Sequence, residues 1–160
     1  MTSQARLKLY SEFEKFGKNV VYFDTDSIFY KKGGYEPICG DYLGMFTNEV
    51  DPQEGTEIIA FVSAGPKNYS YKLDSGVTHC KVKGFSLNIN ASKIIDFEKI
   101  KNIVLTGSDE KTETVEQNLI TRDKSNWTVH TKLCQKKYRL VYDKRFILDD
   151  LTTVPFGYIN

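Results

Sequence analysis

Cysteine pairs, long apolar runs and an excess of one charge are all missing from this sequence. The three cysteines, Cys39, Cys80 and Cys134, are odd in number and form no C-x-x-C pair, which excludes a disulfide framework and a short-spaced zinc site. No run of about 18 apolar residues occurs, and no basic segment precedes an apolar run at the N-terminus. We therefore expect a soluble, intracellular protein with reduced thiols and no membrane partner.

The overall charge gives no sign of a polyanionic partner either. Lys and Arg number 22 against 21 Asp and Glu, a net charge of +1, so any surface for nucleic acid must be a local patch. Hydrophobic residues make up 40% of the 160 positions and charged residues 27%, which are ordinary globular values. Aromatic residues, at 13%, favour β-structure. One domain or two small ones fit this length.

The first 30 residues show a helical pattern followed by a β-hairpin pattern. Apolar residues at spacings of three and four predict an amphipathic helix over residues 3–16, with Gly17 just beyond its end. Two β-rich runs follow, at residues 20–23 and 27–30. Asp24, Thr25 and Asp26 separate these runs, so the predicted hairpin has an acidic tip.

A second hairpin is predicted further along the chain, after a loop-rich stretch and a strand at residues 57–63. Its strands cover residues 67–73 and 77–83, around a turn at residues 74–76 that contains glycine. Because side chains alternate along a strand, each strand carries one row of basic and aromatic residues. The rows are Lys67, Tyr69 and Tyr71 on one strand, and His79, Lys81 and Lys83 on the other. With a suitable register, the two rows form a single basic, aromatic surface.

The last 70 residues predict a helix and three further strands. Asn90 is a suitable cap for a helix whose apolar stripe ends at Gly107. Strands are predicted at residues 115–122, 127–133 and 137–142, with turns at 123–126 and 134–136. The change of composition near residue 90 indicates a boundary there. Together the elements predict an α+β fold with antiparallel hairpins.

Asp24 and Asp26 are the strongest candidates for chemistry. Mg²⁺ binds through carboxylate oxygens that are held rigidly, and a hairpin tip between two strands holds them so. Asp also favours turns for its own local hydrogen bonds, so an isolated D-x-D in a hairpin is more often a simple turn.

The residues around these carboxylates resemble a known motif. The string Tyr22-Phe23-Asp24-Thr25-Asp26-Ser27 resembles motif C of family B DNA polymerases, Y-x-D-T-D-S. The segment Ala5-Arg6-Leu7-Lys8-Leu9-Tyr10 and the segment Gly65-Pro66-Lys67-Asn68-Tyr69 resemble the protein-primed branch of that family, in particular the enzymes of Maverick/Polinton transposons and related viruses. The similarity extends to the C-terminal segments 143–145 and 155–158.

The resemblance implies a role for each matching residue. Asp26 would be the principal ligand of a two-Mg²⁺ site and Asp24 an assisting ligand, while Thr25 would shape the turn beside the primer terminus. Lys67 and Tyr69 match the K-x-Y motif, which steadies the primer strand. Lys81 and Lys83 match a K-x-K-G segment suited to backbone phosphates. By themselves these lysines are equally typical of an exposed, solvated strand.

The same resemblance implies a partial enzyme. It predicts the C-terminal part of a polymerase palm over residues 1–90 and a small, β-rich thumb over residues 91–160. The segments for motif A and motif B, and the exonuclease carboxylates, are absent from the sequence. We therefore expect the isolated chain to bind Mg²⁺ poorly and not to polymerise.

The implied partners are primer-template DNA, deoxynucleoside triphosphates, an N-terminal polymerase half and a terminal protein primer. The nucleus and a viral replication factory both suit such an enzyme. A non-catalytic DNA-binding remnant of a mobile-element polymerase is the alternative function. A globular domain unrelated to polymerases requires all three motif matches to be accidental.

Overall fold

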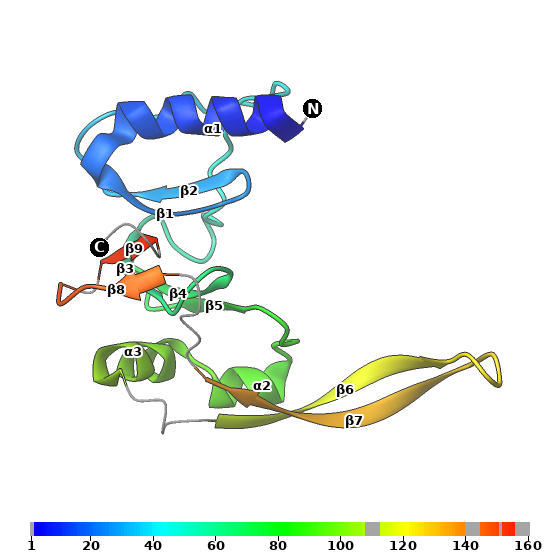
Figure 1. The fold of residues 1–160 in the computed structure, drawn as a ribbon. Helices are drawn as coiled ribbons and strands as arrows, with labels where there is room; N and C mark the ends of the chain where they lie inside the picture. Colours follow the sequence, from blue (N-terminus) through cyan, green and yellow to red (C-terminus); the bar gives the residue numbers. More distant parts are fainter. Residues whose placement is uncertain (1, 108–112, 140–144, 151, 156–160) are drawn as a thin grey trace. The chain divides into compact units, whose positions relative to one another are not determined.

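The computed structural model describes residues 2–107, 113–139, 145–150 and 152–155, and has an α+β fold in which every pair of named strands is antiparallel (Figure 1). The chain divides into two compact units, Met1–Glu57 and Ile58–Asn160. The palm and thumb boundary expected near residue 91 lies inside the second unit. None of the described helices is long and apolar enough to cross a membrane.

The first unit is built from one helix and one hairpin. Helix α1 (Thr2–Phe16) and a 3-10 turn, η1 (Gly17–Asn19), lead into β1 (Val20–Asp24) and β2 (Ser27–Tyr30). The predicted helix and hairpin are therefore confirmed. The helix packs on the hairpin through aromatic rings, since Phe13 lies 4.6 Å from Phe23 and Phe16 lies 4.5 Å from Tyr30, centroid to centroid.

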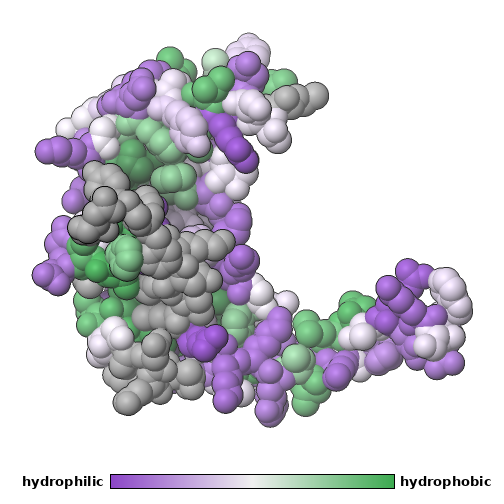
Figure 2. Space-filling view, in the orientation of Figure 1, coloured by the Kyte–Doolittle hydropathy of each residue, from purple (hydrophilic) through white to green (hydrophobic). Residues whose placement is uncertain are grey.

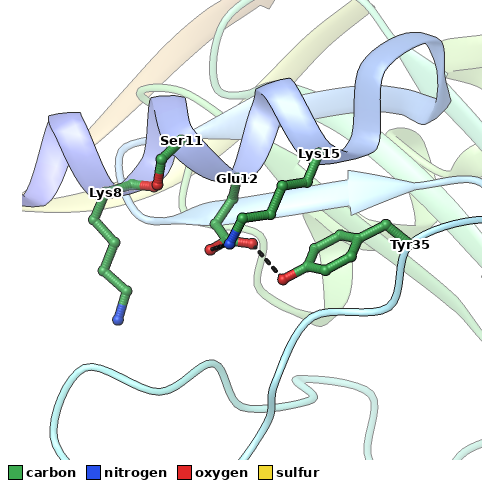
Figure 3. A network of polar contacts seen from close by, with 5 residues as sticks. All are labelled: Lys8, Ser11, Glu12, Lys15 and Tyr35. Carbon is green, nitrogen blue, oxygen red and sulfur yellow. Dashed lines mark hydrogen bonds and ion pairs between the residues drawn. The ribbon is translucent and has the colours of Figure 1, made fainter.

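A buried carboxylate strengthens this packing, and the sequence pattern did not predict it. The Glu12 side chain points from α1 toward Tyr35 in the following loop (Figure 3), and Glu12 is only 7% exposed. Lys15 Nζ lies 2.8 Å from Glu12 Oε1, and the Tyr35 hydroxyl donates a hydrogen bond of 2.9 Å to Glu12 Oε2. The bond from Lys15 lowers the pKa of Glu12, so the carboxylate stays ionised although it is buried.

A three-stranded sheet forms the centre of the second unit. Its strands are β3 (Ile58–Ser63), β4 (Asn68–Leu73) and β5 (Thr78–Val82), in the order β3-β4-β5. The predicted strand and the second hairpin are thus confirmed. The core of this unit joins residues from both sides of position 91: Ala64, Val82, Ala91, Ile95, Ile100, Ile103, Val115 and Tyr138.

The single helix expected from Asn90 to Gly107 is wrong, because two helices occupy this region. Helix α2 (Ile89–Ile94) begins after Asn88, whose side chain accepts a hydrogen bond from the Ala91 amide. Helix α3 (Phe97–Thr106) begins after Asp96, whose side chain accepts from the Lys99 amide. Asp96 caps a new helix and so ends the first one at the preceding residues.

The last predicted strands are also corrected. Strands β6 (Glu113–Asp123) and β7 (Thr128–Tyr138) form one long twisted hairpin, and β7 continues through the turn expected at residues 134–136. Residues 140–142 of the third expected strand lie outside the described residues. A further small hairpin, β8 (Arg145–Ile147) with β9 (Thr153–Pro155), was not predicted.

The middle and the tip of the hairpin of β6 and β7 differ in hydropathy. Apolar residues gather over the middle of this ribbon and hydrophilic residues over its tip (Figure 2). The pairing register places Ile120, Val129 and Leu133 on one face of the ribbon, where all three are exposed.

Candidate functional site

The acidic tip of the first hairpin is organised around the backbone of Asp24. Asp24 ends β1 and pairs with Ser27, so Thr25 and Asp26 form a two-residue loop. The Asp24 carbonyl oxygen accepts a hydrogen bond of 2.6 Å from the Asp26 amide and one of 3.1 Å from the Ser27 hydroxyl. The Thr25 hydroxyl donates to Asp24 Oδ1 over 3.1 Å. The tip therefore has a defined geometry, which a metal ligand requires.

Thr25 adopts a backbone conformation that L-residues avoid. Its φ is +54°, a value at which a β-branched side chain crowds its own backbone. Two-residue hairpin loops need a positive φ at their first position to match the twist of the strands, and glycine usually supplies it. A threonine here costs on the order of 1 kcal/mol, and strain of this kind clusters at functional sites.

The two carboxylates differ in exposure. Asp24 is half-buried and Asp26 is exposed. Carboxylate oxygens are the ligands that Mg²⁺ prefers, so the donor set fits this ion. Among the described residues, no group of three or more His, Cys, Asp or Glu side chains is arranged to hold a metal ion. Two carboxylates are fewer than the six oxygen ligands that Mg²⁺ takes.

The segment containing Lys67 and Tyr69 is a tight turn that leads into β4. The Asn68 amide donates to the Gly65 carbonyl over 3.1 Å, and the Ala64 amide donates to the Asn68 carbonyl over 2.8 Å. Lys67 itself has a positive φ of +57° and is exposed. The sequence predicted the turn but gave no signal for the unusual backbone conformation of Lys67.

Asn68 also ties this turn to the long hairpin. The Tyr138 hydroxyl donates a hydrogen bond of 3.1 Å to Asn68 Oδ1, and Tyr138 is buried. The position of the turn therefore depends on β7, 70 residues away in sequence.

The register of β4 and β5 confirms that the strand residues of the two predicted rows share one face, and Lys67 and Lys83 lie just beyond the ends of these strands. Tyr69 pairs with Lys81 and Tyr71 with His79, while the Lys83 amide donates to the Lys67 carbonyl over 2.8 Å. We call this set the basic aromatic face: Lys67, Tyr69, Tyr71, His79, Lys81 and Lys83. The opposite face of the sheet contributes Ala64 and Val82 to the core.

Aromatic contacts fix the side chains of the basic aromatic face. Tyr71 stacks on His79 at 5.1 Å between centroids, and Tyr69 stacks on Phe61 of β3 at 5.7 Å. Lys81 Nζ lies 5.9 Å from the centre of the Tyr69 ring. Tyr69 is only 3% exposed. In this structure Tyr69 therefore supports a lysine instead of presenting its ring to solvent.

A hollow of about 300 Å³ lies at the β5 edge of the sheet, and three of the predicted lysines line it. Lys67, Lys81 and Lys83 surround it together with Phe85 and Leu87, and Cys80 and Val82 complete the lining. Ammonium groups beside an apolar floor suit a phosphate that is joined to a sugar or base.

Sequence reasoning missed Phe85 and Leu87 beside this hollow. It considered Lys136 only as one of a pair of basic residues able to contact DNA, and did not predict that Lys136 Nζ lies 5.9 Å from the Phe85 ring centre and donates to the Gly84 carbonyl. The alternation of Phe85 and Leu87 after Lys83 was a usable signal for these two. Nothing near Lys136 in the sequence indicates a contact 52 residues away.

The structure thus brings the predicted site residues together in two groups. Asp24, Thr25 and Asp26 form the hairpin tip of the first unit. Lys67, Tyr69, Lys81 and Lys83 share the basic aromatic face of the second unit.

Comparison with known proteins finds no match to this chain among protein-family models, curated proteins or solved structures.

Proposed function

We propose that this chain is the part of a family B DNA polymerase of the protein-primed type that carries motif C, and that it takes part in two-metal nucleotidyl transfer. The observation that carries the proposal is the strained turn at Thr25, which holds Asp24 and Asp26 at the tip of a braced hairpin. A strained residue persists only where its surroundings fix it, and such residues cluster at active sites and ligand clamps.

Asp26 and Asp24 would hold Mg²⁺ in this reaction. Bound Mg²⁺ would activate the primer 3′-hydroxyl and neutralise charge on the leaving pyrophosphate. Asp26, which is exposed, would supply the main ligand oxygen. Asp24, whose backbone and side chain are both engaged in the turn, would fix the orientation of the loop.

The lysines of the basic aromatic face would hold the primer-template backbone. Lys67, Lys81 and Lys83 are among the residues that line one hollow, so a phosphate bound there would have three lysines nearby. Tyr69 would act as a positioning residue, because its buried ring lies against Lys81.

The proposed enzyme requires groups that this sequence does not contain. A carboxylate of motif A must complete the metal shell, and a lysine of motif B must meet the incoming deoxynucleoside triphosphate. An N-terminal part of the polymerase would supply both, and a terminal protein would supply the priming hydroxyl.

Primer extension tests the proposal directly. The chain is assayed with Mg²⁺, primer-template and four deoxynucleotides, alone and with a recombinant polymerase half that carries motifs A and B. We expect extension only with both parts, and its loss in Asp26→Asn. Asp149→Asn, which changes an exposed carboxylate outside the hairpin, is the matched control. Equal extension by Asp26→Asn and the control would refute the metal role.

A non-catalytic DNA-binding module is the second candidate, and the basic aromatic face favours it. That face lies in the second unit and needs no carboxylate to grip phosphate. Binding of this kind is independent of sequence and weakens steeply with salt. Salt-sensitive DNA binding in the presence of a chelator, without extension when the other half is added, would support this candidate over the polymerase.

A further inference from the structure

The loop of residues 38–46 in the first unit is compact and closed by its own backbone. The Gly40 amide donates to the Phe46 carbonyl over 3.0 Å, and the Met45 amide donates to the Tyr42 carbonyl over the same distance. Lys8 of α1 lies over the Phe46 ring, with Nζ 5.9 Å from its centre, and so anchors the loop to the helix. The loop is therefore a formed structure with a fixed base.

This closed loop exposes large apolar side chains. Ile38 is 72% exposed and Tyr42 80%, while Leu43 at the tip is fully exposed. Met45 is also exposed, and its sulfur lies close to Gly40 across the loop. Single exposed apolar residues are common, but four on one nine-residue loop form a patch of the kind that marks interaction sites.

The sequence that contains and follows the loop is acidic, although Lys8 of α1 lies against the loop itself. Residues 33–66 contain six carboxylates and no Lys or Arg, although the whole chain has a net charge of +1. The carboxylates are Glu36, Asp41, Glu49, Asp51, Glu54 and Glu57. Lys32 pairs with Glu57 at 2.6 Å, and Lys8 lies against Phe46. Asp41, within the loop, and Glu49, just after it, are both exposed.

We propose that the 38–46 loop is a docking surface for a protein partner that presents apolar side chains ringed by Lys and Arg. The apolar patch would supply most of the affinity, with Tyr42 and Leu43 as its central side chains. The surrounding carboxylates would select the charge of the partner and speed its association. This proposal does not depend on the proposed polymerase function.

The carboxylates of the loop favour a basic protein partner over DNA or a second copy of this chain. DNA phosphates would meet like charges at Asp41 and Glu49, which costs free energy at short range. A second copy of the chain would bring the same carboxylates against each other at a symmetric contact. A basic, apolar protein surface matches both the patch and its rim.

The test uses the full chain and a defined probe. The probe is a fluorescent helical peptide of Leu and Lys in an amphipathic pattern, 18 residues or about five turns long. A peptide of the same length with Glu in place of Lys is the charge control. We expect the basic peptide to bind, to shift the backbone amide resonances of residues 38–46, and to weaken as salt is raised. The acidic peptide and a DNA duplex should leave these resonances unchanged.

Two loop variants and one matched control complete the test. Leu43→Ser and Asp41→Lys should each weaken binding of the basic peptide by about ten-fold. Leu105→Ser removes a similarly exposed leucine from α3 in the second unit, and should bind as the unchanged chain does. Thermal unfolding confirms that all three variants are folded.

Three results would overturn the proposal. The first is no binding of the basic peptide, or resonance shifts that map away from the loop. The second is an equal response of the loop to the acidic peptide or to DNA. The third is a concentration-dependent shift of the loop resonances without any peptide, which would identify self-association as the role of the patch.

Discussion

Tyr69 on β4 stands directly opposite Lys81 on β5, and the Lys81 ammonium lies 5.9 Å from the centre of the Tyr69 ring. Because Tyr69 is buried and also stacks on Phe61, its ring offers the exposed Lys81 side chain a fixed contact. A lysine held in this way loses less side-chain entropy when it binds a phosphate. The relationship explains how a buried tyrosine contributes to a surface that would bind nucleic acid.

The salt dependence of DNA binding reports how many lysines contact phosphate. Lys81→Ala and Lys83→Ala should each weaken binding for all sequences and reduce the slope of log K against log salt by about 1. Lys101→Ala is the control, because Lys101 lies on α3 and pairs with Glu98 at 3.3 Å. Fluorescence anisotropy over a salt series measures the slopes. An unchanged slope in Lys81→Ala and Lys83→Ala would remove these residues from the binding surface.

The strain at Thr25 predicts an unusual effect of glycine. Thr25→Gly should raise the free energy of unfolding by about 1 kcal/mol, because glycine adopts a φ of +54° without the crowding of a β-branched side chain. The same variant loses the hydroxyl that donates to Asp24, so extension by the reconstituted enzyme should fall. Urea denaturation and primer extension measure the two effects. A lower unfolding free energy would show that the turn is not strained.

Local turn chemistry explains what the sequence could predict. The residues Asp24 to Asp26 and Asp74 to Gly76 mark tight turns between β-rich runs, and both hairpins were predicted nearly to their ends. Once a hairpin is fixed, the period of two also fixes which side chains share a face. The basic aromatic face was therefore predictable from the sequence, including its four lysine and tyrosine site residues.

The missed features depend on residues far apart in the sequence or on competing local signals. From the sequence alone, Glu12 is expected to be a solvated residue on a helix. Its burial depends on Tyr35, which lies 23 residues later. Asp96 interrupts an apolar stripe that otherwise reads as one helix. The polar residues 134–136 read as a turn, but they alternate between the two faces of β7 and so continue the strand.

The Glu12 cluster predicts a dependence of stability on pH. The pKa of Glu12 is lowered in the folded state. The ionised Glu12 therefore contributes fully to the free energy of unfolding above its unfolded pKa near 4.5, and this contribution is lost as the pH falls through its folded pKa. The same bond raises the pKa of Lys15, so the pair stays intact at neutral pH. The free energy of unfolding of Glu12→Gln should therefore fall less steeply below pH 4.5 than that of the unchanged chain. Denaturation midpoints between pH 3 and about 7 measure the difference.

Truncation of the same residue tests its hydrogen bonds. Glu12→Ala leaves the Tyr35 hydroxyl without its carboxylate acceptor and should cost about 1–3 kcal/mol of unfolding free energy at pH 7. Glu14→Ala is the control, because Glu14 is exposed on the same helix. Equal effects of the two variants would show that the Glu12 carboxylate contributes no more than an exposed one.

The hydrogen bond between Tyr138 and Asn68 links the long hairpin to the turn at Lys67. Tyr138→Phe removes the donor but keeps the buried ring, and should lower the free energy of unfolding by about 1 kcal/mol. Because Asn68 lies between Lys67 and Tyr69, the variant should also shift the Lys67 amide resonance. A shift confined to β7 would show that the bond does not position the turn.

Cys80 lines the same hollow as Lys67, Lys81 and Lys83, and its reactivity reports on that hollow. Burial raises the pKa of the Cys80 thiol, partly offset by a hydrogen bond with Ser70. At pH 8 the thiol should react with iodoacetamide on the order of ten-fold more slowly than exposed Cys39. Mass spectrometry of digested samples gives both rates.

Adding a DNA duplex to the same reaction tests whether DNA occupies the hollow beside Cys80. If phosphate and sugar occupy the hollow, saturating DNA should slow the modification of Cys80 further and leave the rate at Cys39 unchanged. Cys39 is the internal control, because it belongs to the first unit, whereas the basic aromatic face belongs to the second. Protection of Cys80 should disappear in a Lys81→Ala, Lys83→Ala double variant under the same conditions. An unaltered Cys80 rate at saturating DNA would place the DNA on another surface of the protein.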